Sequence, residues 1–252
     1  MSVFITGASS GLGEALARHY AAAGHTLGLV ARRGERLAQL AASLPGTHHL
    51  YVLDVRDREA LHAAARDFLL RAGSVDIVVA SAGISAGTLT EELDDFGMFN
   101  SIFETNVLAT VATFEPFIES MVARQRGTLV GIASVAGVRG LPGAGAYSAS
   151  KAAVATYCES LRLELQPKGV GVVTIAPGYI RTEMTAHNPY SMPFLMEAHD
   201  FATRAAKAIG QQVSYRVIPW QMGWVARIMR VLPDWLYDRL AVNAPRKPRK
   251  PL

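Results

Sequence analysis

Cysteine and long apolar runs are nearly absent from this sequence. Cys158 is the single cysteine among 252 residues, which excludes an intrachain disulfide and leaves no cysteine cluster for a metal ion, as fits a reducing compartment. No apolar run reaches the roughly 18 residues that a membrane-spanning helix needs, and the strand-like segment SVFIT begins without a charged leader and an apolar signal core. We therefore expect a soluble, cytoplasmic protein without a metal site.

An excess of charge of one sign is also missing from most of the chain. The formal net charge is +4, and it comes entirely from four basic residues near the C-terminus: Arg246, Lys247, Arg249 and Lys250. A nucleic-acid surface needs basic residues clustered across the fold, so we expect no nucleic-acid partner, and only this basic tail is a candidate contact for a polyanion. Half of the residues are hydrophobic, which excludes disorder, and the length fits one domain over residues 1–252.

A serine, a tyrosine and a lysine are spaced for acid–base chemistry in the stretch SVAGVRGLPGAGAYSASK. Tyr147 and Lys151 are i and i+4 of a predicted helix, so an ammonium lies beside a phenol. A nearby positive charge favours the phenolate and lowers the tyrosine pKa from about 10 towards the range of a general acid. Ser134 follows an apolar run and is suited to hydrogen-bond the same substrate oxygen. A Tyr-x-x-x-Lys pair alone is usually only a helix-surface pair, so the catalytic interpretation depends on the motifs around it.

A glycine-rich turn follows the first apolar run. The spacing from Gly7 to Gly13 is G-x-x-x-G-x-G, and a helical pattern comes directly after it. Glycines let the backbone approach a dinucleotide pyrophosphate, and the N-terminus of the helix offers N–H groups to the anion. The pattern predicts a cofactor-binding turn, although glycine turns also simply connect strands to helices.

Two arginines follow the second predicted strand. No Asp or Glu occurs between Leu27 and Gly34, and Arg32 and Arg33 stand at the strand end. An acidic residue here usually holds a free ribose 2′-hydroxyl, whereas arginine matches a 2′-phosphate. The sequence therefore favours NADP(H) over NAD(H). The alternative is that both arginines only begin a solvated helix.

Strand and helix patterns alternate along the chain. Such a rhythm predicts a parallel sheet with right-handed crossovers, and it brings the strand ends near Arg32, Asp54 and Gly83 to the ligand-binding edge of the sheet. We predict an α/β fold, a Rossmann-like three-layer α/β/α sandwich with a seven-stranded, mainly parallel sheet in a single domain. Residues 91–126 are expected to be helical. Asn106 lies there in an apolar segment, where it either satisfies local backbone groups or holds a water or a catalytic side chain.

The segment 183–200 is rich in methionine, proline and aromatic residues. In this position it predicts a mobile cover over the cleft, lined by Met184, Tyr190, Met192 and Phe194. A plain connecting loop is the alternative, but long loops in compact domains are usually functional or disordered.

The C-terminal extension, residues 220–252, is amphipathic and basic. Its aromatic residues include Trp220, Trp224 and Trp235, with arginines among them. Such a stretch suits weak contact with an anionic membrane surface. We favour instead that the aromatics cover the substrate pocket or pack against another subunit, because burial is the commoner fate of aromatic stripes.

These motifs together resemble the short-chain dehydrogenase/reductase family over about positions 2 to 220. The residues that carry the resemblance are Thr6-Gly7-x-x-x-Gly11-x-Gly13, Asp54-Val55, Ser81-Ala82-Gly83, Asn106, Ser134, Tyr147-x-x-x-Lys151 and Pro177-Gly178. The resemblance implies an Asn-Ser-Tyr-Lys catalytic tetrad. In it Tyr147 is the acid/base, Ser134 orients the substrate oxygen, Lys151 binds the nicotinamide ribose and lowers the tyrosine pKa, and Asn106 supports a water in a proton relay.

The resemblance also implies the ligand contacts. The cofactor residues are Gly7, Ser9, Ser10, Gly11, Leu12, Gly13, Arg32, Arg33, Asp54, Val55, Ala82, Gly83, Asn106, Tyr147, Lys151, Pro177, Gly178, Ile180 and Thr182. The substrate residues are Ser134, Tyr147, Met184 and Tyr190. A homodimer or homotetramer is expected, formed by the long helices around residues 100–125 and 147–166.

Two departures from the family pattern affect the cofactor site. Ala80 and Ser81 stand where two asparagines are usual, which loses side-chain amides but keeps small residues beside the adenine ribose. Ser10 stands where many NADP(H)-preferring relatives have a basic residue, so the coenzyme prediction depends on Arg32 and Arg33.

The sequence thus predicts an NADP(H)-dependent oxidoreductase of the short-chain dehydrogenase/reductase type. It would transfer hydride between the nicotinamide and a carbonyl or secondary alcohol on a fairly apolar small molecule. One alternative is an NADP(H)-binding sensor or scaffold without turnover. Another is a peripheral membrane reductase of lipid-like carbonyls.

Overall fold

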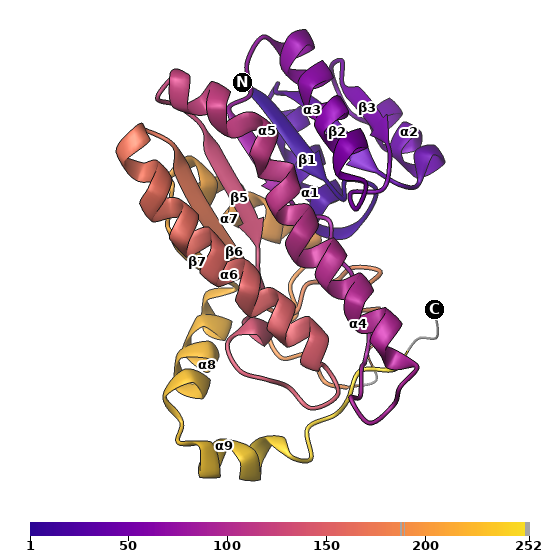
Figure 1. The fold of residues 1–252 in the computed structure, drawn as a ribbon, viewed down its shortest axis with the longest axis vertical. Helices are drawn as coiled ribbons and strands as arrows, with labels where there is room; N and C mark the ends of the chain where they lie inside the picture. The colour runs from indigo at the N-terminus through magenta and orange to yellow at the C-terminus, as the bar shows by residue number, and fades with distance from the viewer. Residues whose placement is uncertain (187, 189, 250–252) are drawn as a thin grey trace.

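A parallel sheet forms the centre of the molecule. The computed structural model describes residues 1–186, 188 and 190–249, so Lys250 of the predicted basic tail lies outside the described residues. In this part of the chain seven strands pair in the order β3-β2-β1-β4-β5-β6-β7, all of them parallel (Figure 1). The strands are β1 Ser2–Thr6, β2 Thr26–Ala31, β3 His49–Val52, β4 Ile77–Ala80, β5 Thr128–Ile132, β6 Gly171–Pro177 and β7 Tyr215–Ile218.

Helices cover both faces of this sheet, which confirms the predicted three-layer sandwich. One core is built from the sheet with α1 Gly11–Ala22, α2 Gly34–Ser43 and α7 Ala198–Gly210. The opposite core is built with α3 Arg58–Ala72, α5 Ala109–Ala123 and α6 Gly145–Leu165. The remaining α-helices are α4 Asp95–Phe103, α8 Trp220–Val231 and α9 Asp234–Ala241.

The central strands are apolar on both faces because helices cover both. All five residues of β1 are buried. Successive side chains of the strand point alternately to the two cores, as the two-residue period of a strand requires. Phe4 packs against Phe68 and Phe117, with ring centroids 5.7 and 4.9 Å away. Val3 and Ile5 belong to the opposite core. Burial on both sides fixes the register of the strand whose end carries the glycine turn.

The helical segment predicted over residues 91–126 is interrupted. α4 ends at Phe103, a π-helical turn η1 spans Glu104–Leu108, and α5 begins at Ala109. Asn106 lies in this turn and is fully buried. The side chain of Thr110 donates to the carbonyl of Asn106 at 2.8 Å, which supports the widened turn. Single π turns inside α-helices occur mostly at functional sites, and this one carries a predicted tetrad residue.

The last two helices form an arm beyond the sheet. α8 and α9 extend away from the core, and the chain then returns towards α4 (Figure 1). Arg139 holds the arm: its guanidinium donates to the carbonyls of Met229 and Leu232 at 3.2 and 3.0 Å and to Asp234 at 2.8 Å. It also lies 4.2 Å from the ring centroid of Tyr237.

Among the described residues, no helix combines the length and apolar character required for a membrane span.

Candidate active site

A cleft of about 520 Å³ lies at the carboxyl ends of the strands, where open α/β sheets bind ligands. Every residue that the sequence assigned to the cofactor lines this cleft except Asn106. Its lining also includes Ser134 and Met184 from the predicted substrate set, and four residues with charged or hydroxyl side chains that the sequence did not single out: Ser85, Thr105, Glu183 and Thr185.

The glycine turn is packed too tightly for side chains. A Cβ at Gly7, which has φ +69°, would lie 2.8 Å from backbone atoms of Ala82, and one at Gly13 would overlap the carbonyl of Gly7. Ser10, the N-cap residue of α1, gives no side-chain hydrogen bond to the described part of that helix. The first-turn N–H groups of α1 are therefore open to an anion, and the turn fits a dinucleotide pyrophosphate.

The arginine that meets this turn is Arg33. Its guanidinium donates to the hydroxyls of Ser10 and Ser9 at 2.6 and 3.4 Å and to the Glu183 carboxylate at 3.0 Å. Arg36 pairs with the same carboxylate. Hydrogen bonds from both arginines lower the pKa of Glu183. Glu183, in the predicted cover segment, thus forms an ion pair with Arg33, whose guanidinium the sequence analysis assigned to a 2′-phosphate.

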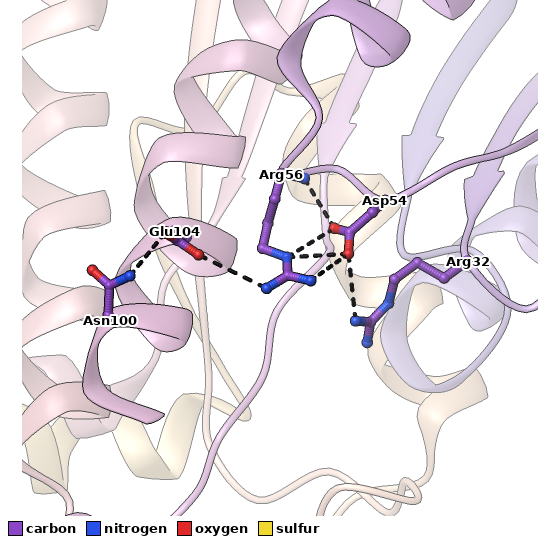
Figure 2. A network of polar contacts seen from close by, with 5 residues as sticks. All are labelled: Arg32, Asp54, Arg56, Asn100 and Glu104. Carbon is purple, nitrogen blue, oxygen red and sulfur yellow. Dashed lines mark hydrogen bonds and ion pairs between the residues drawn. The ribbon is translucent and has the colours of Figure 1, made fainter. Parts of the chain in front are cut away.

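Arg32 takes part in a different network, around Asp54 (Figure 2). Its side chain is 61% exposed, and its guanidinium lies 3.7 Å from the Asp54 carboxylate. Arg56, which the sequence analysis did not select, binds that carboxylate at 2.7 Å and reaches towards Glu104 at 3.8 Å. The hydrogen bond from Arg56 lowers the pKa of Asp54. Asp54 is therefore held ionised at this end of the cleft.

Tyr147 and Lys151 lie together at the other end, in the first turns of α6. The Lys151 ammonium is 5.9 Å from the centroid of the tyrosine ring and donates to the carbonyl of Ile132 at 2.8 Å. Burial lowers the pKa of Lys151 to about 8. The predicted pairing of phenol and ammonium is thus present in the structure, and the lysine loses part of its charge slightly above neutral pH.

The pKa of Tyr147 differs from the sequence-based expectation. Burial raises it, and a hydrogen bond with Ser134 only partly opposes that rise. The expected lowering by Lys151 is wrong, because burial of the phenol disfavours the phenolate and the group that opposes this rise is Ser134 rather than Lys151. The phenol is consequently protonated at neutral pH, which is the state that can donate a proton to a carbonyl oxygen.

Asn106 lies behind the cleft rather than on its wall. Its carboxamide accepts from the N–H of Ile84 at 2.8 Å and donates to the Ile84 carbonyl and the Ser150 hydroxyl, both at 3.0 Å. A Cβ at Gly83 would lie 3.2 Å from its oxygen and 3.6 Å from the Lys151 ammonium nitrogen. Asn106 therefore positions the loop that carries Gly83, and this loop lies between Asn106 and Lys151.

Of the described residues in the predicted cover segment, Glu183, Met184 and Thr185 line the cleft. A bridge between Ile180 and Met196 joins the chain before this segment to its later part. Tyr190 packs edge-on against Tyr179 with centroids 6.4 Å apart. Tyr190, Met192 and Phe194 do not line the cleft, contrary to the prediction, and Phe194 is 51% exposed. His187 and Pro189 of this segment lie outside the described residues.

The aromatic residues of the arm do not cover the cleft. Trp220, Trp224 and Trp235 are 62, 56 and 69% exposed, and the first two line a separate groove between α8 and β7. The prediction that these side chains cover the substrate pocket is therefore wrong. Their helices are attached to the fold through Arg139 and leave the indole rings on the outside.

A second lysine lies near the tyrosine. Lys247, from the predicted basic tail, has its ammonium 6.0 Å from the centroid of the Tyr147 ring and donates to the hydroxyl of Ser85 at 2.9 Å. The sequence analysis treated this residue only as part of a polyanion contact. Nothing in its local sequence signals a contact with a residue 162 positions away.

Comparisons with known proteins agree on one family. A family model described as short chain dehydrogenase matches residues 1–191. A protein of Myxococcus xanthus (strain DK1622), named an uncharacterized oxidoreductase, is 40% identical over 243 residues, which cover 95% of this chain and 96% of that protein.

Two solved structures extend this similarity to the fold. A short-chain dehydrogenase from Sphingobium yanoikuyae in complex with NADPH superimposes with a TM-score of 0.77, at 27% identity over 92% of this chain and 96% of that one. A 3-ketoacyl-(acyl-carrier-protein) reductase from Brucella melitensis complexed with NADH gives a TM-score of 0.77, at 25% identity over 86% and 96%.

Proposed function

The chain belongs to the short-chain dehydrogenase/reductase family, and on that premise we propose that it is an NADP(H)-dependent oxidoreductase interconverting a carbonyl and a secondary alcohol. The observation that carries this proposal is the meeting of Ser134, Tyr147 and Lys151 at one end of a cleft whose other end is a glycine turn. A dinucleotide along such a cleft brings its reactive ring to an acid–base group. The nicotinamide supplies the hydride chemistry when it is bound.

In the direction of reduction, Tyr147 donates its phenolic proton to the substrate oxygen. Ser134 hydrogen-bonds the same oxygen and holds it against the phenol, as its hydrogen bond with Tyr147 supports. The phenolate left behind is stabilised by the Lys151 ammonium, which also binds the nicotinamide ribose. Asn106 supports the proton relay from behind, through the loop that it holds beside Lys151.

The coenzyme preference for NADP(H) is supported by the adenosine end of the cleft. Arg33, joined to the hydroxyls of Ser9 and Ser10, and Arg32 form the positive group that suits a 2′-phosphate. The Sphingobium neighbour holds NADPH and the Brucella neighbour holds NADH, so the preference is assigned on these side chains. The remaining cofactor residues assigned from the sequence are proposed to line the bound dinucleotide.

A fairly apolar substrate body is proposed from the cover segment. Met184 lines the cleft, and Tyr190 lies close enough to Tyr147 to influence its pKa. Segment 183–200 is proposed to close over the bound substrate.

The family premise supports a homodimer or homotetramer. Two exposed leucines offer apolar surface for subunit contact: Leu108, which is 62% exposed, and Leu163, which is 60% exposed. A cytoplasmic location belongs to the same proposal.

The test combines cofactor binding with turnover. Binding of NADPH and NADH is measured by fluorescence titration, and a panel of ketones and secondary alcohols is then screened by the change in NADPH absorbance. Tight NADPH binding with turnover of any member supports the oxidoreductase. Tight binding without turnover across a broad panel supports a sensor or scaffold, and failure to bind either coenzyme rejects both.

The arm favours one variant of this function, a reductase that contacts membranes and acts on lipid-like carbonyls. Trp220, Trp224 and Trp235 are exposed, and Arg227 and Arg230 line the groove beside them. Exposed indoles with arginines suit an anionic lipid surface. Co-sedimentation with anionic vesicles of the full chain and of a variant with the three tryptophans changed to serine tests it, and equal sedimentation would reject it.

A further inference from the structure

A groove separate from the catalytic cleft lies between α8 and β7. Its volume is about 390 Å³, which is within the range of small-molecule sites. In the described part of the chain it shares no lining residue with the cleft. β7 is the last strand of the sheet, and Figure 1 shows α8 beyond its end, well apart from β3 and α4. The groove is therefore a second candidate binding site with walls of its own.

The floor of the groove is built from small and apolar residues. Val217 of β7 and Gly223 and Ala226 of α8 line it. A Cβ at Gly223 would lie 3.5 Å from the Cβ of Val217, so a large side chain at this position would fill the space between helix and strand. Ala226 also belongs to a buried cluster with Val135 and Met222. The floor is thus fixed to the fold, as in a preformed ligand site.

Aromatic rings form the walls of the groove. Trp220, Trp224 and Arg227 are spaced by four and three positions, so they share one face of α8. Tyr215 lines the groove from β7. All three aromatic side chains are exposed, although each is large and mostly apolar. Exposed aromatic groups that meet in one concave surface indicate a binding site.

The groove is positively charged. Its lining contains no Asp or Glu but includes three arginines: Arg216, Arg227 and Arg230. None of these guanidinium groups forms an ion pair with a carboxylate of the described residues. Asp234, the acidic residue that follows α8, pairs with Arg139 at 2.8 Å instead. Because like charges repel one another, an anion in the groove would be bound favourably.

The aromatic rings and the guanidinium groups lie within reach of one another. The guanidinium of Arg227 is 5.1 Å from the ring centroid of Trp224. Arg230 lies near Tyr215: partial burial raises the pKa of Tyr215, and the positive charge of Arg230 partly opposes that rise. A ligand that carries both a ring and an anionic group would therefore meet aromatic faces and guanidinium donors at the same time.

We propose that this groove binds a small aromatic carboxylate, with Trp220 and Trp224 contacting its ring and Arg230 binding its carboxylate. Such a molecule matches the apolar floor and the positive charge together, and a guanidinium suits a carboxylate because it can donate two parallel hydrogen bonds. The site is additional to the cleft and does not depend on the proposed reaction. A membrane surface would instead contact every exposed indole of the arm, Trp235 included.

The first experiment measures whether binding needs the anion and Arg230. Isothermal titration calorimetry compares 2-naphthoate with its neutral analogue, 2-naphthamide, on the full chain. Arg230→Met should weaken 2-naphthoate binding about tenfold, because a hydrogen bond to a charged group is lost, and leave 2-naphthamide unchanged. Arg239→Met is the matched control, since Arg239 is an exposed arginine of α9 outside the groove. No binding of 2-naphthoate, or equal binding of both probes to the wild type, would overturn the proposal.

A second pair of variants tests the rings. Trp224→Ser should weaken the binding of both probes about fivefold, through loss of a ring contact. Trp235→Ser is the control, because Trp235 is also exposed but lies on α9 outside the groove. Neither side chain is in the core, so both variants should fold. Equal losses in the two variants would place the probe elsewhere on the arm and contradict the groove.

Two further titrations separate the groove from the other surfaces. Saturation with NADPH should leave the affinity for 2-naphthoate unchanged, since the cleft and the groove share no lining residue among those described. Displacement of the probe by NADPH would assign it to the cleft and overturn the proposal. Vesicles of phosphatidylserine and phosphatidylcholine test the lipid alternative. If these vesicles bind the chain while 2-naphthoate does not, the indoles and arginines form a lipid contact and the groove site is wrong.

Discussion

Arg33 and Glu183, 150 positions apart in the chain, form an ion pair at 3.0 Å across the cofactor end of the cleft. The carboxylate comes from the proposed cover segment, and the guanidinium is the group assigned to the 2′-phosphate. A phosphate bound by Arg33 would also lie close to the Glu183 carboxylate, which repels it. The pair therefore links coenzyme choice to the cover segment.

We expect Glu183→Gln to tighten NADPH binding only roughly two- to fivefold, because an exposed ion pair contributes little. NADH binding should stay unchanged, since NADH lacks the phosphate. Fluorescence titration of both coenzymes measures the effect. Glu197→Gln is the matched control, because Glu197 also pairs with an arginine of this region, Arg181 at 2.6 Å. Equal changes for both coenzymes would show that Glu183 does not compete with the phosphate.

Arg33→Met should weaken NADPH binding about tenfold more than NADH binding, through loss of a charged partner of the 2′-phosphate. Arg32→Met is expected to have a smaller effect, because Arg32 is more exposed and is directed to Asp54. The ratio of the two dissociation constants is the measurement. The assignment of the phosphate to Arg33 fails if Arg32→Met produces the larger change.

Tyr147→Phe should abolish turnover and keep coenzyme binding within about twofold, because the variant lacks only the hydroxyl that donates the proton. Tyr157→Phe, on the same helix, is the control and should retain activity. Absorbance assays and fluorescence titration give the two measurements. Retained ketone reduction by Tyr147→Phe would remove the phenol from the mechanism.

The rate of ketone reduction should fall as pH rises through about 8. Burial lowers the pKa of Lys151 to about 8, so the ammonium that stabilises the phenolate is present below this pH and lost above it. The phenol has a raised pKa and stays protonated over the same range. A kcat/KM profile for a neutral ketone measures this. Lys151→Arg, with a pKa above about 12, should move the falling limb to higher pH, and an unmoved limb would assign it to another group.

Asn106→Ala should lower the free energy of unfolding by about 2 kcal/mol, because it leaves the part-buried N–H and carbonyl of Ile84 without the side chain that binds both. Urea denaturation measures the loss. Asn100→Ala is the control: Asn100 lies on the exposed side of α4 and donates only to Glu104 in the described contacts, at 2.8 Å. A loss below about 1 kcal/mol would contradict the structural importance assigned to the carboxamide.

The sheet was predictable because its determinants are local. Each central strand is a short apolar run with a turn signal after it, as β1 is before Gly7, and burial on both faces requires that pattern. The pairing of Tyr147 with Lys151 was equally local, since helical geometry fixes residues four positions apart. The residues that line the cleft were predictable from the strand ends, because these ends meet at one edge of a parallel sheet.

The contacts that sequence reasoning missed join distant segments. Glu183 reaches Arg33, and Lys247 reaches Ser85, through turns and loops that leave no periodic signal. The rise in the pKa of Tyr147 was missed for a related reason: the burial of a phenol depends on the packing of several segments, whereas its neighbour one turn away is visible in the sequence. The π turn at Asn106 likewise reflects a bond to Ile84 rather than a helix-breaking residue.

Arg139 stands in the loop between Ser134 and Tyr147, and it holds the turn between α8 and α9. The hydroxyl of Tyr237 in α9 also donates to the carbonyl of Gly140 at 2.6 Å. The arm and the loop between Ser134 and Tyr147 therefore share these contacts, so a displacement of the arm must either break them or move the loop as well.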